Sequence, residues 1–186
     1  IARGLAGFDS QVLLEGFVEA SERGDGRYDF STFATMLEAA QREGVQVIWD
    51  LCHFGWPDGL DVFSPAFVER FAAFSRAVAE FIADADKDVP FFVPVNEISF
   101  LSWAAGEEGY IHPYAKDRGF ELKQQLVRAA IAGIKAVRAV DPRARILHVD
   151  PVIHVIAPRD RPDLAQAAEQ YRLSQFEAWD MVAGRV

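Results

Sequence analysis

The chain repeats one unit three times: a short apolar run, a polar residue at its end, a loop and then a helical pattern. The apolar runs span residues 45–52, 89–95 and 144–149, and they predict strands near residues 45–51, 90–96 and 145–150. Near-continuous apolar strands are typical of a sheet that is buried on both faces, and such sheets are parallel. Strands that alternate with helices predict the α/β class. An earlier run, residues 11–18, fits either a further strand or the start of a helix.

Four helical patterns fill the remaining sequence. Ser31 and Ser64 are each predicted to cap the start of a helix, and Pro65 takes the first helical position of the second. The four patterns run from Ser31 to Gly44, from Pro65 to Phe81, and over about residues 120–140 and 162–183. No linker or charge block divides the chain, so residues 1–186 are expected to form a single domain.

The charge and apolar content of the chain limit the classes of partner that it can bind. The chain has 19 Lys and Arg against 28 Asp and Glu, a net charge of −9. Such an acidic chain is a poor match for nucleic acid or anionic lipid, and no apolar run approaches the ~20 residues that span a bilayer. We therefore expect neither a nucleic-acid nor a membrane partner, and a cytoplasmic location.

No cofactor is expected. Cys52 is the only cysteine, which excludes an internal disulfide and a cysteine-rich zinc site. The four histidines lack the tight spacing of metal ligands, and no glycine-rich dinucleotide motif follows a strand. Because adjacent strand residues point to opposite faces, Cys52 is interpreted as a packing residue and not as a nucleophile beside His53.

Polar side chains follow each predicted strand. In chain order they are Asp50 with His53, Asn96 with Glu97, and Asp150 with His154. Function gathers at the carboxyl ends of parallel strands, so these groups are expected to converge on one concave surface. For any single residue the alternative is a helix cap or a loop hydrogen bond.

Glu97 is the strongest candidate for catalysis. It follows an apolar run and Asn96, and Ile98 and Phe100 lie just downstream. Apolar neighbours disfavour an ionised carboxyl, which suits a general acid, and the amide of Asn96 can donate to a substrate hydroxyl. The alternative for Glu97 is an ion pair with a neighbouring arginine.

Aromatic residues surround the first two strand ends. Residues 50–57 combine an acidic residue, an imidazole and two aromatic rings, which suit the hydroxyls and C–H faces of sugars. Trp103, Tyr110 and His112 lie in the expected loop after Glu97, where they either line a cleft or simply pack.

Three motifs resemble family 1 glycoside hydrolases, the β-glucosidase-like enzymes. Residues 94–97, Pro-Val-Asn-Glu, resemble the T-x-N-E-P end of that family's fourth strand. Residues 51–57 resemble its third-strand exit L-H-H-W-D-L-P, and Gly109-Tyr110 with Pro113 resembles its G-Y…P-G loop. The resemblance covers about residues 28–150. It departs from the family at Ile98, where the family has proline, and at Phe54-Gly55, where it has Trp-Asp.

The resemblance implies a (β/α)₈ barrel, of which this chain would form about strands two to five. It also implies retaining β-glycoside hydrolysis, with Glu97 as acid/base, Asn96 on the sugar 2-hydroxyl and His53 in contact with the sugar. It assigns no role to Asp50 or Asp150. These two, with Trp103, are predicted as substrate-binding residues from their positions alone.

A retaining enzyme needs a second carboxylate as nucleophile, and the family places it on the seventh strand. A complete barrel usually needs ~250 residues. We therefore expect that the nucleophile lies outside this chain, that the chain alone is inactive, and that its uncovered barrel edges promote self-association. Two rival hypotheses are a non-catalytic carbohydrate-binding or interaction module, and a small doubly wound α/β hydrolase that uses Asp50 and His53.

Overall fold

A computed structural model of the protein describes residues 28–186, and three short strands form its sheet. They are β1 (Ile48–Asp50), β2 (Phe91–Val93) and β3 (Arg145–Ile146). All neighbours pair in parallel in the order β1-β2-β3. The predicted α/β class, strand order and strand direction are confirmed. The earlier apolar run, residues 11–18, lies outside the described residues.

Each strand is shorter than its apolar run. Pro90 and Pro94 flank β2, and because proline has no N–H to donate, it interrupts a sheet ladder. Isolated backbone hydrogen bonds extend the pairing beyond the regular strands. Leu51 N–H donates to the Val93 carbonyl at 2.9 Å, and Leu147 N–H donates to the Phe92 carbonyl at 2.8 Å.

Three long helices are α2 (Ser31–Glu43), α3 (Pro65–Ala85) and α5 (Gly119–Val140). Between α3 and α5, the short helix α4 (Ile98–Leu101) continues directly into a π-helical segment, η1 (Ser102–Glu107). Gly44 ends α2 with a left-handed φ of 63°, and Ser64 and Pro65 open α3, both as predicted. The prediction that Ser31 caps α2 is wrong by one position. Phe30 is the cap residue, and the side chain of Asp29 accepts the Ser31 N–H at 2.9 Å.

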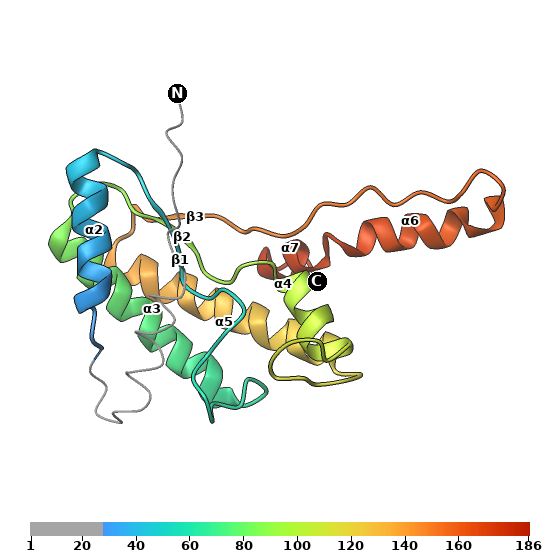
Figure 1. The fold of residues 1–186 in the computed structure, drawn as a ribbon, viewed down its shortest axis with the longest axis horizontal. Helices are drawn as coiled ribbons and strands as arrows, with labels where there is room; N and C mark the ends of the chain where they lie inside the picture. The colour runs from blue at the N-terminus through green and yellow to red at the C-terminus, as the bar shows by residue number, and fades with distance from the viewer. Residues whose placement is uncertain (1–27) are drawn as a thin grey trace.

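Helices α3 and α5 pack against each other on the same side of the sheet (Figure 1). Their contact and the sheet are filled by fully buried residues, among them Phe67, Phe71, Phe74, Val78, Phe92, Leu122 and Leu126. Sequential parallel strands with right-handed crossovers place successive helices on one face. This arrangement fits a barrel wall and not a doubly wound sheet, which needs helices on both faces.

The other face of the sheet is open at its first strand. Ile48 in β1 is 49% exposed, whereas Trp49 beside it is buried. The prediction that all three strands are buried on both faces is therefore wrong for β1, and also for β3, in which Arg145 is exposed and Ile146 is half-buried. No helix in residues 28–186 is long and apolar enough to cross a membrane.

The predicted helix over residues 162–183 is broken into three pieces. They are a 3₁₀ turn, η2 (Pro162–Leu164), and the helices α6 (Ala165–Ser174) and α7 (Glu177–Val182). On a helix the five-residue step from Tyr171 to Phe176 turns the apolar positions by about 140°, so the predicted positions do not share one face. Helix α6 has no buried residue and projects from the rest of the protein with the extended segment 147–161 (Figure 1).

We predict that Gly133→Ala destabilises the fold although alanine favours helix. A Cβ at Gly133 would lie 2.9 Å from the Phe71 ring and 3.0 Å from Ser75 Oγ, across the α3–α5 contact. Overpacking of this kind costs about 1–3 kcal/mol in the free energy of unfolding, measurable by urea denaturation. Lys135→Ala, at an exposed position of the same helix, is the control and should change the free energy little. A Gly133→Ala variant as stable as the native chain would contradict the tight contact.

Candidate active site

Backbone hydrogen bonds join the exits of the three strands, that is, the residues that follow the carboxyl end of each strand. After β2, Asn96 N–H donates to the Cys52 carbonyl at 2.9 Å, which ties it to the β1 exit. The next residue, Glu97, donates its N–H to the Val149 carbonyl at 2.9 Å, which ties it to the β3 exit. The ends of the three strands, which carry Asp50, Asn96 with Glu97, and Asp150, are therefore neighbours at one end of the sheet.

Asn96 and Glu97 present polar groups that the described protein does not use. Asn96 is 8% exposed, and its side-chain amide makes no hydrogen bond within residues 28–186. Glu97 is half-buried and, over the same residues, forms no ion pair, so the alternative of a partner arginine is not realised there. An unpaired carboxyl beside an unpaired amide can serve a ligand that offers hydroxyl groups.

Asp50 orients the imidazole of His53. The carboxylate Oδ2 lies 2.8 Å from His53 Nδ1, and Oδ1 accepts the Cys52 N–H at 3.3 Å. Burial raises the pKa of Asp50 above its ordinary value, and the hydrogen bond from His53 lowers it in part. The His53 side chain is 40% exposed. With Nδ1 held by the carboxylate, Nε2 remains for a ligand.

Cys52 is a packing residue, as predicted. It is 4% exposed and belongs to the main hydrophobic core. Burial, followed by the charge of Asp50, raises the pKa of its thiol to about 12. A thiol that stays protonated at neutral pH is not a nucleophile.

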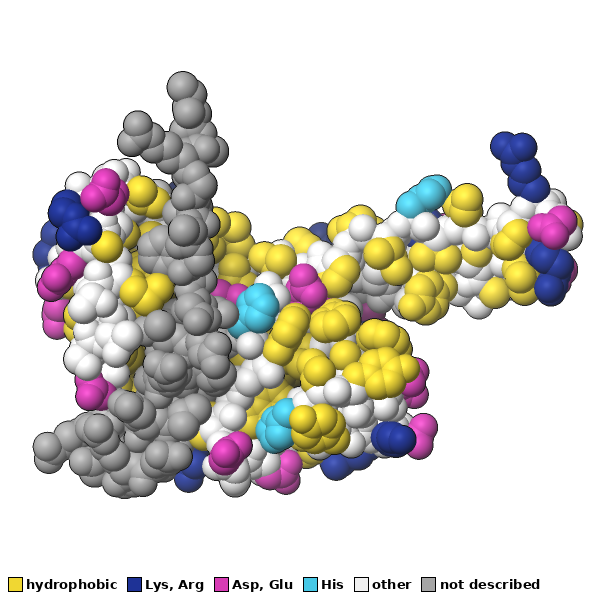
Figure 2. Space-filling view, viewed as in Figure 1, with side chains coloured by type: hydrophobic (Ala, Val, Ile, Leu, Met, Phe, Trp, Pro, Cys, Tyr) yellow, Lys and Arg dark blue, Asp and Glu magenta, His cyan; other side chains and the backbone are white. Residues whose placement is uncertain are grey.

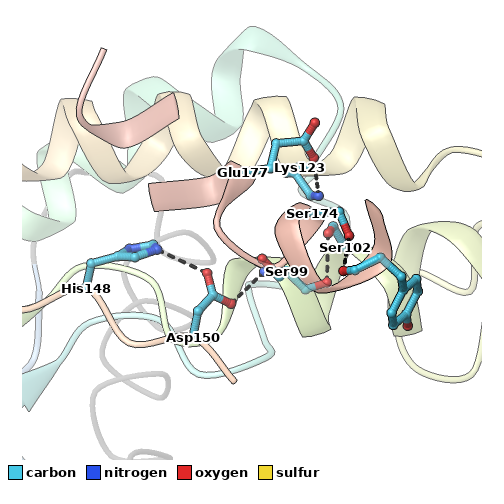
Figure 3. A network of polar contacts seen from close by, with 8 residues as sticks. Ser99, Ser102, Lys123, His148, Asp150, Ser174 and Glu177 are labelled. Atoms are coloured by element: carbon cyan, nitrogen blue, oxygen red, sulfur yellow. Dashed lines mark hydrogen bonds and ion pairs between the residues drawn. The ribbon is translucent and has the colours of Figure 1, made fainter. Parts of the chain in front are cut away.

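Asp150 is committed to contacts within the protein. Its side chain has no exposed surface. One carboxylate oxygen accepts the Ser99 N–H at 2.8 Å and the other lies 3.0 Å from His148 Nε2 (Figure 3). Its predicted contact with substrate remains a prediction. His154, from the same strand end, is exposed on the extended segment that follows β3.

A row of aromatic rings leads away from His53. The ring centroids of His53 and Phe54 are 4.6 Å apart, those of Phe54 and Phe100 5.4 Å, of Phe100 and Trp103 5.9 Å, and of Trp103 and Tyr110 5.6 Å. Figure 2 shows hydrophobic side chains gathered where α4 and η1 lie, with histidine at the border of the patch. Trp103 is 45% exposed, so this row offers a ligand an aromatic surface.

One expectation about this region needs correction, and His112 follows the packing alternative. Trp103 lies in the π-helical segment η1 and not in a loop. His112 packs on the buried Trp56, with ring centroids 5.0 Å apart. Sequence reasoning counted Phe54 among the aromatic rings of residues 50–57 but missed Phe100 as a member of the row. The three-residue steps from Glu97 to Phe100 and Trp103 are helical spacing and could have indicated a shared face.

The described residues offer no metal site. No group of three or more His, Cys, Asp or Glu side chains in residues 28–186 is placed to hold a metal ion.

Comparison with solved structures identifies the architecture. The chain superimposes on a family 1 β-glucosidase from Thermotoga maritima with a TM-score of 0.73 at 16% sequence identity, over 87% of this chain and 40% of that one. The same enzyme in complex with deoxynojirimycin gives 0.72 at 18% identity, over 84% of this chain and 36% of that one. The chain has the fold of part of a family 1 β-glucosidase barrel.

A third structure extends the likeness. The virulence factor SghA, solved with its substrate analogue salicin, gives a TM-score of 0.71 at 18% identity, over 84% of this chain and 36% of that one. The chain thus spans little more than a third of the length of these structures. No protein-family model and no curated protein sequence matches it. At such identities the likeness establishes the fold, and activity is a separate question.

We predict that Asp50→Asn becomes more stable relative to the native chain as pH rises above about 4, the ordinary pKa of an aspartate. A raised pKa means that the folded state holds the Asp50 proton more tightly than the unfolded state. The native chain therefore loses stability as pH rises from the pKa of Asp50 in the unfolded state through its higher pKa in the folded state. The asparagine of the variant cannot ionise and causes no such loss. Urea denaturation of both proteins between about pH 3.5 and pH 6 measures the difference.

Asp141→Asn is the matched control for this prediction. A hydrogen bond and ion pair with Arg143 lower the pKa of Asp141, so the native chain gains stability from this group as pH rises. The variant should therefore become less stable relative to the native chain over the same pH range. A stability difference for Asp50→Asn that is independent of pH, or that moves in the same direction as the control, would contradict the assignment.

Proposed function

We propose that this chain carries the acid/base side of a retaining β-glycosidase site, with Glu97 as the proton donor. The observation that carries the proposal is the position of Glu97: beside Asn96, hydrogen-bonded into the β3 exit, and free of ion pairs in the described chain. The family 1 β-glucosidase fold around it supports the same conclusion. Family 1 glycosidases keep an Asn-Glu pair at this strand end, as the sequence motif implies.

In the proposed reaction, a nucleophilic carboxylate attacks the anomeric carbon while Glu97 protonates the departing oxygen. Glu97 then removes a proton from the water that releases the sugar. The nearby carboxylates of Asp50 and Asp150 are both committed, the first to His53 and the second to Ser99 and His148. We therefore propose that the nucleophile comes from outside this chain.

The remaining predicted residues are proposed to hold a carbohydrate. The Asn96 amide would bind the sugar 2-hydroxyl, and Nε2 of His53, oriented by Asp50, would bind a second hydroxyl. Trp103 and its aromatic row would contact the apolar face of the sugar or its aglycone. Two of the similar structures were solved with deoxynojirimycin and with the substrate analogue salicin, which supports a ligand of this kind.

A second candidate is carbohydrate binding without turnover by this chain. The committed state of Asp50 and Asp150 favours it, because a lone acid/base carboxyl binds sugar but cannot complete double displacement.

The direct test is a titration of the 186-residue chain with deoxynojirimycin, followed by NMR. We expect perturbed amides at Asn96, Glu97, His53 and Trp103, and weaker binding to Glu97→Gln because the amine of the ligand loses a carboxylate partner. Glu121→Gln, at an exposed carboxylate on α5 paired with Arg118, is the control and should bind like the native chain. Absent binding, or equal binding to Glu97→Gln, would refute the proposed site.

The same chain should not hydrolyse activated aryl glycosides. Where the rest of a barrel supplies the nucleophile, Glu97→Gln should lower turnover of ordinary glycosides by about 10²–10⁴-fold, the usual contribution of a positioned acid. For glycosides whose leaving group needs no proton, the variant should keep much of the rate of the first step, and azide should restore the rate of the second step. Steady-state kinetics with and without azide make the comparison. Unchanged turnover of an ordinary glycoside would rule out Glu97 as the acid.

A further inference from the structure

Glu97 has a strained backbone conformation at the start of α4. Its φ and ψ are 48° and 57°, in the left-handed region that residues with a side chain rarely adopt. Such a conformation persists only where surrounding contacts over-determine it. The contacts around Glu97 therefore decide where its carboxyl group is presented.

The chain that follows β3 supplies two of those contacts. The carbonyl of Val149 accepts the Glu97 N–H at 2.9 Å, and the carboxylate of Asp150 accepts the Ser99 N–H at 2.8 Å. Helix α4 has no side-chain cap of its own at Glu97. From a neighbouring strand end, Asp150 thus satisfies a free N–H of the first turn, as a capping side chain normally does from within the same segment.

Asp150 is itself held in place from behind. Its fully buried carboxylate pairs with His148 Nε2 at 3.0 Å (Figure 3). The His148 ring packs edge-on against Trp179 of α7, with centroids 4.7 Å apart. The ion pair between Lys123 and Glu177 joins α7 to α5. A buried carboxylate with both oxygens bonded is a fixed point, which suits it to hold backbone and not to follow a ligand.

We propose that Asp150 is a positioning residue for Glu97. With His148 behind it, Asp150 fixes the first turn of α4 and keeps Glu97 in its left-handed conformation, so that the carboxyl is presented at the strand exit. This inference rests on the acid/base role proposed for Glu97. It gives Asp150 a different task from the substrate contact that its place in the sequence predicts.

The test measures backbone geometry in the 186-residue chain by NMR. In Asp150→Ala, the amide protection of Ser99 should fall by about tenfold or more, as expected when a charge-assisted hydrogen bond is lost. The scalar couplings and chemical shifts that report φ at Glu97 should show that φ has left the left-handed range. A purely stabilising role would lower global stability without moving φ at Glu97. Native protection at Ser99 and a native φ at Glu97 would overturn the proposal.

Asp141→Ala is the matched control. Asp141 is also buried, also accepts a backbone N–H, that of Arg143 at 2.9 Å, and also has a basic side chain as partner, but it lies at the opposite end of β3. Its loss should lower global stability and leave Ser99 and Glu97 unchanged. An equal change of φ at Glu97 in both variants would count against a specific role for Asp150.

Two further measurements keep the outcome decisive. If Asp150→Ala does not fold, Asp150→Asn replaces it. A neutral acceptor makes a weaker hydrogen bond than a carboxylate, so the amide protection of Ser99 should fall about threefold or more. Unchanged protection of Ser99 would overturn the proposal. The geometric readout does not depend on sugar binding. A native response to deoxynojirimycin in Glu97→Gln would therefore refute the proposed function and leave the positioning role of Asp150 to be judged by φ alone.

Discussion

The hydrogen bonds donated by Asn96 and Glu97 to the neighbouring strand exits hold the candidate site together. One binds the β1 exit at the Cys52 carbonyl and the other binds the β3 exit at the Val149 carbonyl. Because Pro94 interrupts the regular ladder, these bonds resume the pairing further along the chain. The polar residues of three distant sequence segments become neighbours through them, and their chemistry can be considered as one site.

The packing behind the sheet makes that arrangement rigid. Helices α3 and α5 lie together on one side, and aromatic side chains fill the space between them and the strands. Gly133 allows the two helices to approach closely, since a side chain there would collide with Phe71. Support from one side leaves the strand exits and the row from His53 to Tyr110 as the face that carries the candidate site.

Local patterns predicted the parts of the fold that depend on local physics. The apolar runs located the strands, Gly44 and Pro65 marked helix boundaries, and the polar residues after each strand marked the exits. Contacts across long sequence separations had no such signal. The bond from Ser99 to Asp150 joins residues 51 positions apart, and Phe54 enters the aromatic row from a left-handed conformation, φ 63°, that a ring-bearing residue seldom adopts. The five-residue step from Tyr171 to Phe176 departs from helical spacing and coincides with the break between α6 and α7.

The site depends above all on the bonding of the β2 exit to both of its neighbours. The scalar coupling across a hydrogen bond, between the amide nitrogen of one residue and the carbonyl carbon of the other, measures this directly by NMR. We predict couplings from Asn96 to Cys52 and from Glu97 to Val149, in addition to the coupling from Leu51, which directly follows β1, to Val93. Detection of the Leu51 to Val93 coupling without the other two, in the same sample, would show that the strand exits do not form one site.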